Sequence, residues 1–238
     1  MRIKKFIQKK TIRLLNSKKI LKIFFYYHKI FNNKGLKDIG FDFTLKKSRK
    51  HIVQDIIDIK KYTKYLEIGC FDDELFDIIN IDQKIGVDPV SGGTIRLTSD
   101  QFFLENKEFF DCIFIDGLHT YDQVKRDIQN SLKFLNKNGI ILLHDCLPNN
   151  FYEQATPRCQ WTWNGDVWKA IVECRTDKNL DVYTCYADFG IGVIFKRPNK
   201  KLLDYQISNF SKLKFEDYHK DPYHLMNIIE YDDLRKIL

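Results

Sequence analysis

A regular alternation of short apolar runs and amphipathic helical patterns begins near residue 48 and most limits what this chain can fold into. The expected strands are Tyr65–Ile68, Lys84–Asp88, Cys112–Ile115 and Gly139–Leu143. Helical patterns cover residues 50–60 and 121–135, and the second one has Val124, Ile128, Leu132 and Leu135 on one face. Apolar strands that alternate with such helices predict an α/β fold, with a parallel sheet covered on both sides.

Acidic residues stand at the end of each expected strand: Glu67, Asp88, Asp116 and Asp145. The carboxyl ends of parallel strands meet at one edge of a sheet, and ligands bind beyond that edge. A single acid at such a position can be only the N-cap of the next helix. Four of them, one for each strand, favour a binding site.

Cysteine usage indicates the environment of the chain. The 238 residues include six cysteines, scattered singly without the short spacings of a zinc site or a disulfide framework. Reduced thiols in a cytoplasmic protein are the expected state.

The length of the chain suits one large α/β domain with appendages.

The positive charge is concentrated at the N-terminus. Residues 1–36 contain eleven Lys and Arg and no acid, whereas the rest of the chain has 28 basic and 32 acidic residues. Apolar residues recur there at helical spacing: Ile3, Ile7, Leu14, Leu21 and Phe25. Lysines interrupt every apolar stretch, which excludes a secretory signal and a membrane-spanning helix. Two interpretations stay open for this arm, peripheral docking at the inner membrane face and packing on the main domain or on a second copy.

The first strand and the end of the second have the layout of a nucleoside-binding unit. Gly69, in LEIGC, permits a tight turn, and Asp88 can accept both hydrogen bonds of a ribose diol. The motif GxGxxG is absent, and Asp72, Asp73 and Glu74 follow instead. These acids would repel a pyrophosphate. A cationic cofactor without phosphates, such as S-adenosylmethionine, fits better.

Four segments carry a family resemblance: YLEIGC, GVDPV, IFIDGLHTYDQVKRDI and GIILLHDCLP. In this order they resemble the class I S-adenosylmethionine-dependent methyltransferases, and most of all the group of macrolide-sugar and polysaccharide O-methyltransferases. The resemblance implies a Rossmann-like, doubly wound, mostly parallel seven-stranded sheet with an antiparallel terminal hairpin at DVYTCYADFGIGVIFKR. The expected organisation is a basic helical arm (1–47), a methyltransferase domain (48–198) and a C-terminal helical cap (199–238).

The resemblance also implies roles for single residues. The cofactor-binding residues are Glu67 and Gly69 on the methionine half, Asp88 on the ribose, Ser99 and Asp100 near the adenine, and Asp116. The later glycines of the usual cofactor loop are missing here.

Methyl transfer to a hydroxyl requires the oxygen to lose its proton, which a divalent cation and an imidazole can assist. In the resembling enzymes the aspartate of DxxH binds a magnesium-like ion and the histidine is the base. Here these are Asp116 and His119, with Asp145 as a second metal ligand, and carboxylates suit Mg²⁺ or Mn²⁺. Strand alternation predicts that His144 points to the other side and is structural. The competing interpretation makes His119 a helix cap without chemistry.

All three tryptophans lie in QWTWNGDVWKA. Aromatic faces suit the C–H faces of a sugar. Trp168 is expected to anchor a helix over 167–175, with Asp166 as its N-cap. The expected substrate-binding residues are Trp161, Trp163, Asn164, Asp166 and Arg158.

The sequence therefore predicts a metal-assisted O-methyltransferase for a sugar or polyhydroxylated acceptor in surface polysaccharide or glycoside biosynthesis. Two alternatives remain: a metal-independent methyltransferase for an amine or phosphorylated small molecule, and a non-catalytic membrane-surface binder. Net acidity outside the arm argues against nucleic acid as a partner. A homo-oligomer is left open.

Overall fold

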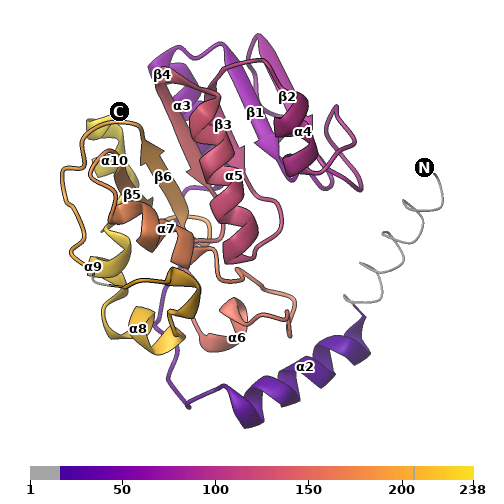
Figure 1. Ribbon diagram of the computed structural model, residues 1–238, viewed down its shortest axis with the longest axis vertical. Coiled ribbons are helices and arrows are strands. Elements are labelled where there is room, and N and C mark those ends of the chain that lie inside the picture. The colour runs from indigo at the N-terminus through magenta and orange to yellow at the C-terminus, as the bar shows by residue number, and fades with distance from the viewer. Residues whose placement is uncertain (1–16, 206) are drawn as a thin grey trace.

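A mixed seven-stranded sheet forms the centre of the protein in the computed structural model, which describes residues 17–205 and 207–238 (Figure 1). The strand order is β2-β1-β3-β4-β6-β5-β7. The strands are β1 (Lys64–Ile68), β2 (Gln83–Val87), β3 (Phe110–Ile115), β4 (Leu135–Leu143), β5 (Asp181–Cys185), β6 (Ile191–Phe195) and β7 (Ile228–Ile229). The predicted fold class is confirmed, because β1 to β4 are parallel and β6 runs antiparallel to both β4 and β5.

The parallel strands end at one level. Ile68 pairs with Val87 and with Ile115, and Ile115 pairs with Leu143. The residues that follow the strands therefore emerge side by side at one edge of the sheet. This edge holds the candidate site.

The described residues form nine helices, and most of them cover the two faces of the sheet (Figure 1). They are α2 (Lys18–Phe31), α3 (Arg49–Lys60), α4 (Ser99–Glu105), α5 (Tyr121–Lys133), α6 (Phe151–Gln154), α7 (Trp168–Arg175), α8 (Phe215–Lys220), α9 (Pro222–Met226) and α10 (Tyr231–Ile237), with a 3₁₀ turn η1 (Phe210–Lys212). Alternate residues of β4 enter two separate cores. Ile141 and Leu143 join the core with α5 and α7, whereas Ile140 and Leu142 join the core with α3 and α10.

Two predicted boundaries differ from the structure. The helix expected to reach residue 135 ends at Lys133, because Leu135 already pairs with Phe110 as the start of β4. The C-terminal segment, expected as a helical cap, also contributes β7, which pairs in parallel with β5. Residues 199–238 are thus built into the sheet as well as packed around it.

The N-terminal arm is described from residue 17 onward, so the predicted positions Ile3, Ile7 and Leu14 lie outside the described residues. The helix α2 lies apart from the sheet and next to α6 (Figure 1). Ser17 caps it by accepting a hydrogen bond from the Ile20 amide at 3.4 Å. Within the ranges 17–205 and 207–238, no helix has the length and apolarity that crossing a membrane would require.

Candidate active site

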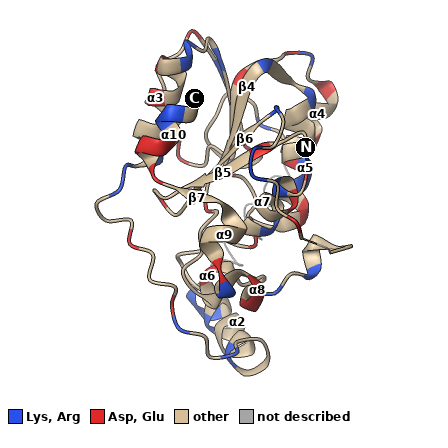
Figure 2. Cartoon of the chain, turned by 90° about the vertical axis from the view of Figure 1, so that its left-hand side faces the viewer, with Lys and Arg blue, Asp and Glu red and all other residues tan. Residues whose placement is uncertain are grey.

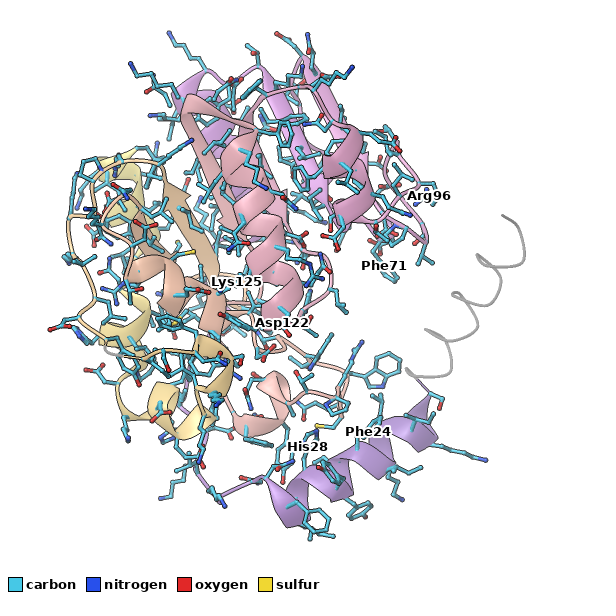
Figure 3. The ribbon with its side chains drawn as sticks, in the orientation of Figure 1. Phe24, His28, Phe71, Arg96, Asp122 and Lys125 are labelled. Carbon is cyan, nitrogen blue, oxygen red and sulfur yellow. The ribbon has the colours of Figure 1, made fainter. Side chains whose placement is uncertain are left out.

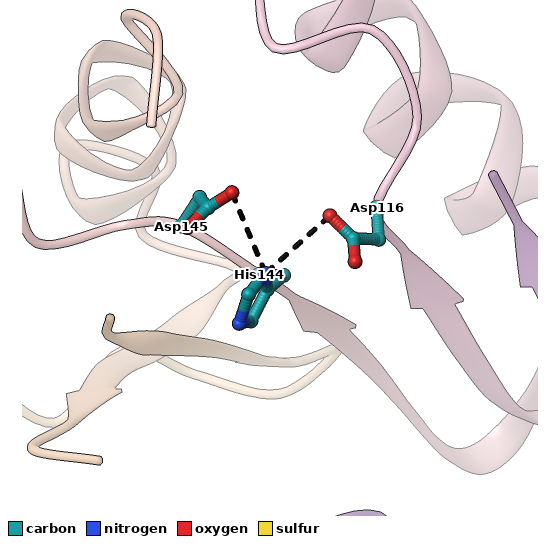
Figure 4. Close-up of side chains that lie close together, drawn as sticks. All are labelled: Asp116, His144 and Asp145. Carbon is teal, nitrogen blue, oxygen red and sulfur yellow. Dashed lines mark ion pairs between the residues drawn. The ribbon is translucent and has the colours of Figure 1, made fainter. Parts of the chain in front are cut away.

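Three side chains converge where β3 and β4 end (Figure 4). His144 Nδ1 lies 3.4 Å from Asp116 Oδ1 and 3.5 Å from Asp145 Oδ2. One ligand atom from each of the three residues lies within 4.8 Å of the others. Two carboxylates and an imidazole at this spacing can hold a metal ion.

His119 completes this group from the loop between β3 and α5. Its Nε2 lies 3.1 Å from Asp116 Oδ1, and its Nδ1 lies 3.2 Å from Asp145 Oδ2. The same Nδ1 lies 3.0 Å from the carbonyl oxygen of Trp163, and the imidazole stacks on that indole at 5.3 Å. The structure thus brings together Asp116, His119 and Asp145.

Strand alternation places His144 on the α3 side of the sheet, as expected, but the prediction that this separates it from the acids was wrong. Its Nδ1 lies within 3.5 Å of both carboxylates. The backbone of Asp145 has a φ of +61°, and this turn is accompanied by close approach of the Asp145 carboxylate to the His144 ring. The imidazole is almost fully buried and lies beside Phe114 on the α3 side of the sheet.

Two further residues support His144 and were missed from the sequence. Asp188 Oδ1, in the turn between β5 and β6, lies 3.2 Å from His144 Nε2. Arg49, the first residue of α3, lies with its Nη1 3.5 Å from Asp188 Oδ1 and also donates its backbone N–H to that carboxylate. An acid in a hairpin turn and an arginine at a helix start gave no sequence signal for this pairing.

The charges of the group stabilise one another. Burial alone would raise the pKa of Asp116, but His144 and His119 hold that pKa well below its usual range. Burial would lower the pKa of His119, yet Asp145 and Asp116 raise it above the ordinary value. The pKa of His144 is likewise raised, since Asp145 and Asp116 outweigh its burial. The two carboxylates therefore favour positive charge between them, as a divalent cation site must.

The β1 end of the same edge is built differently. Glu67 is 2 % exposed and accepts a hydrogen bond from the Tyr65 hydroxyl at 2.7 Å. Burial, together with Asp116 and Asp73, raises the pKa of Glu67 to about 7 against the opposing Tyr65 bond. Gly69 has a φ of +91°, and a Cβ there would lie 2.2 Å from the Asp116 carbonyl oxygen. Only glycine fits this approach of the two strand ends.

Asp88, after β2, organises the loops around it. Its Oδ2 accepts the Phe71 amide at 3.1 Å, and its Oδ1 accepts the amides of Val90 and Ser91 at 2.7 and 2.9 Å. Arg96 donates to the Asp88 carbonyl oxygen at 2.8 Å. The Phe71 and Arg96 side chains lie at the outer end of these loops (Figure 3), and Phe71 is largely exposed.

Ser99 and Asp100 lie at the start of α4, facing α5. Gln123 Nε2 donates to Ser99 Oγ at 3.1 Å and to Asp127 Oδ1 at 3.0 Å. Asp127 is a buried carboxylate that the sequence reasoning missed, and burial raises its pKa to about 6. Arg126 Nε lies 3.5 Å from the second carboxylate oxygen of Asp100.

The expected substrate residues lie in different environments. Trp161 is 62 % exposed, and the Arg158 guanidinium lies 5.5 Å from its ring centre and 5.7 Å from that of Trp163. The indole N–H of Trp163 donates to the Ala155 carbonyl oxygen at 2.7 Å. Trp168 is fully buried, as predicted.

Asn164 and Asp166 hold other parts of the site in position through hydrogen bonds. Asn164 is fully buried and donates to Asp145 Oδ1 at 3.2 Å, so it positions a carboxylate. Asp166 was expected to cap the helix that follows it, but α7 begins only at Trp168 and its N-cap is Val167. Asp166 instead accepts the backbone N–H of Tyr121 at 2.6 Å, at the start of α5. Neither geometry was readable from local sequence, because both partners are distant in the chain.

Comparison with known proteins agrees with this picture. A family model described as a methyltransferase domain matches residues 81–146. The match runs from the start of β2 to the end of β4 and so includes Asp88, Asp116, His119 and Asp145. It supports the predicted enzyme class, an S-adenosylmethionine-dependent methyltransferase. Among curated proteins, none matches the chain.

Solved structures with a similar arrangement include three methyltransferases. An O-methyltransferase from Bacillus cereus in complex with SAH is 12% identical, with a TM-score of 0.47, over 76% of this chain and 100% of that one. The O-methyltransferase TomG from Streptomyces achromogenes, in complex with SAM, is 10% identical, with a TM-score of 0.48, over 71% and 86%. An SAH-bound methyltransferase from Podospora anserina is 18% identical, with a TM-score of 0.47, over 78% and 97%.

Proposed function

We propose that this protein is an S-adenosylmethionine-dependent, divalent-metal-assisted O-methyltransferase for a sugar or other polyhydroxylated acceptor. The observation that carries the proposal is the group of Asp116, His119, His144 and Asp145 at the ends of β3 and β4. It lies within the segment matched by the methyltransferase-domain model. The acceptor class rests on the exposed Trp161 and on the resemblance to the macrolide-sugar and polysaccharide group.

The residues present fit a divalent cation. Asp116, Asp145 and His144 would hold it, and their ligand atoms lie within 4.8 Å of one another. The buried Asn164 Oδ1, beside Asp145, has no hydrogen-bond partner among the described residues, so it would be available to a group bound at this site. The two carboxylates suit Mg²⁺ or Mn²⁺, and of these two ions Mn²⁺ accepts an imidazole nitrogen more readily. The donor set therefore favours Mn²⁺ over Mg²⁺.

The residues at the β1 and β2 ends fit a cationic cofactor. Asp88 brings a carboxylate to this part of the edge, and a bound cation would favour the ionised form of Glu67, whose pKa is otherwise about 7. Asp88 has accepted three backbone amides but keeps lone pairs for a ribose diol. Glu67, Gly69, Ser99, Asp100 and Asp116 would line the remainder of the cofactor.

In the proposed reaction, the bound cofactor supplies an electrophilic methyl group, and the bound cation lowers the pKa of the acceptor hydroxyl. The protein's task is to orient that hydroxyl and to accept its proton. His119 Nδ1 is oriented toward the Trp163 carbonyl oxygen, which fixes a proton on Nδ1. Nε2 lies 3.1 Å from Asp116 Oδ1, and it would become the proton acceptor once Asp116 binds the cation in place of the Nε2 proton. Stacking on Trp163 keeps the ring in this plane.

The direct test is calorimetric titration with S-adenosylmethionine, followed by transfer of labelled methyl groups to a panel of nucleotide sugars. We expect saturable cofactor binding and transfer that exhaustive chelation abolishes and Mn²⁺ restores. Binding of a nicotinamide dinucleotide in place of S-adenosylmethionine would refute the enzyme class. Transfer that survives chelation would favour the metal-independent alternative, in which Asp116 only orients His119.

A further inference from the structure

The helix α2 has one side that packs on the protein. Leu21 and His28 are buried, and the His28 Nε2 lies 2.9 Å from the Pro157 carbonyl oxygen. Phe25 stacks on Tyr152 at 4.6 Å. Phe24 and His28 lie on the side of α2 that faces the body of the protein (Figure 3). These contacts hold α2 against the segment around α6.

The opposite side of α2 is apolar, and residues 17–205 and 207–238 leave it exposed. Ile23, Tyr27, Ile30 and Phe31 are 65, 47, 70 and 66 % exposed. Their spacing of i, i+4, i+7 and i+8 places them in one stripe along the helix. A contiguous exposed stripe of large side chains marks an interaction surface more often than isolated exposed residues do. We call these four residues the outer stripe.

The charges of α2 indicate what the outer stripe contacts. Lys19 lies directly beside the stripe, one turn before Ile23, and the helix contains no acid. Lys18, Lys22 and Lys29 lie in one row between the stripe and the packed side. None of the three forms an ion pair with any residue of 17–205 or 207–238. Figure 2 shows blue lysine segments on the ribbon of α2 and no red one. The partner must therefore be apolar at its centre and negatively charged at its rim.

We infer that α2 docks in the plane of a bilayer that contains anionic lipids. The outer stripe would enter the boundary between headgroups and acyl chains, and the lysine row would contact lipid phosphates. A second copy of α2 would also cover the stripe, but it would bring together two helices that each carry four lysines and no acid, which costs free energy. Anionic lipid satisfies both features at once.

The location of α2 gives this docking a consequence for the rest of the protein. The segment on which α2 packs continues from α6 to Trp161 and Trp163, the residues proposed to contact the acceptor. The bilayer would thus lie on the same side as the proposed acceptor site. Docking itself does not depend on methyl transfer, so it can be tested without an activity assay.

The test is flotation of the full chain with vesicles of equal parts phosphatidylglycerol and phosphatidylcholine, compared with phosphatidylcholine alone. We expect binding to the anionic vesicles, weakened by salt, with little binding to the neutral ones. Ile23→Ser with Ile30→Ser should reduce binding about tenfold or more, because two apolar side chains leave the interface. Lys18→Gln with Lys22→Gln should reduce it by roughly fivefold for each lysine. The matched control is Ile78→Ser with Leu104→Ser, which removes two exposed apolar side chains away from α2 and should bind as wild type.

Two outcomes would overturn the inference. If the Ile23 and Ile30 variant floats as wild type, the outer stripe does not contact lipid, even if another basic segment does. If the wild-type chain does not float and instead sediments as a dimer that the same variant dissociates, a second copy covers the stripe. Circular dichroism of each variant checks that the fold is intact.

Discussion

The two halves of the sheet edge carry the same type of residue in opposite settings. Glu67 and Asp88, at the ends of β1 and β2, are satisfied by a tyrosine hydroxyl and by backbone N–H groups. Asp116 and Asp145, at the ends of β3 and β4, are satisfied mainly by imidazoles. Neutral hydrogen-bond donors fix the position of a carboxylate and of the loops around it. Titratable partners such as histidine can also place a positive charge beside it. An acid that follows a parallel strand can thus be expected to lie at the site. The groups that surround this acid then indicate its role.

The largest expected effect separates chemistry from binding in the β3–β4 half. His119→Ala should retain cofactor and metal affinity but lose roughly 10²–10⁴ in kcat, the usual worth of a positioned base. Because the base must be unprotonated, the wild-type rate should rise with pH through the His119 pKa, which neighbouring carboxylates raise. This limb of the pH–rate profile should vanish in the variant.

The control for His119 is His51→Ala, an exposed histidine on α3 that should leave the rate unchanged. A near wild-type rate in His119→Ala, with the pH limb intact, would reduce His119 to a helix-capping residue. The charged residues of the β3–β4 half would then take no part in proton transfer.

In the β1–β2 half, the burial of Glu67 should appear as pH-dependent stability. Its pKa is about 7 in the folded protein, above the ordinary 4.5, so the folded state binds this proton more tightly than the unfolded state does. The stabilisation is complete below pH 4.5 and is lost as the pH rises through 7. The total is about 3 kcal/mol. Glu67→Gln keeps the Tyr65 hydrogen bond and should lose this pH dependence.

Thermal unfolding between pH 5 and pH 8 measures the effect of Glu67, with the exposed Glu105→Gln as the matched control. If wild type and Glu67→Gln show the same change in unfolding free energy across this range, Glu67 is ionised throughout. The contrast between the two halves would then be smaller than the structure indicates.

Asp188→Asn should weaken the metal site without touching the metal. His144 Nε2 lies against the Asp188 carboxylate, and such a partner orients a ligating histidine and raises its basicity. We expect Mn²⁺ affinity to fall roughly 10–100-fold, measured by calorimetry, while saturating Mn²⁺ restores the rate. Asp82→Asn, at an exposed turn, is the control. Unchanged Mn²⁺ affinity in Asp188→Asn would remove His144 from the ligand set.

The sequence predicted what depends on local pattern and missed what depends on distant backbone geometry. Hydrophobic periodicity located β1 to β4, and strand-end position located Asp116 and Asp145. The positive φ of Asp145 and the close approach of the β5–β6 turn determine the contacts of His144 and Asp188. Neither feature produces a hydrophobic periodicity in the sequence. Asp166 was assigned to the adjacent helix because sequence proximity favours local caps, whereas packing placed it at the start of α5.

The smallest expected effect tests whether the two halves have separate roles. Asp88→Asn replaces one carboxylate oxygen by an NH₂ group, so either the Phe71 amide or the Val90 and Ser91 amides lose their acceptor. A lost bond of this kind costs about 1–3 kcal/mol. The loops should loosen, and S-adenosylmethionine affinity should fall by about tenfold.

The informative comparison for Asp88→Asn is Asp116→Asn, the same substitution at the other half of the edge. Asp116→Asn removes a proposed metal ligand, so excess Mn²⁺ should recover part of its lost rate by mass action. Asp88→Asn has no metal to regain, and excess S-adenosylmethionine should rescue it instead. Rescue of Asp88→Asn by Mn²⁺ would mean that the two halves are coupled. The loosened loop after β2 would in that case have weakened metal binding at the end of β3.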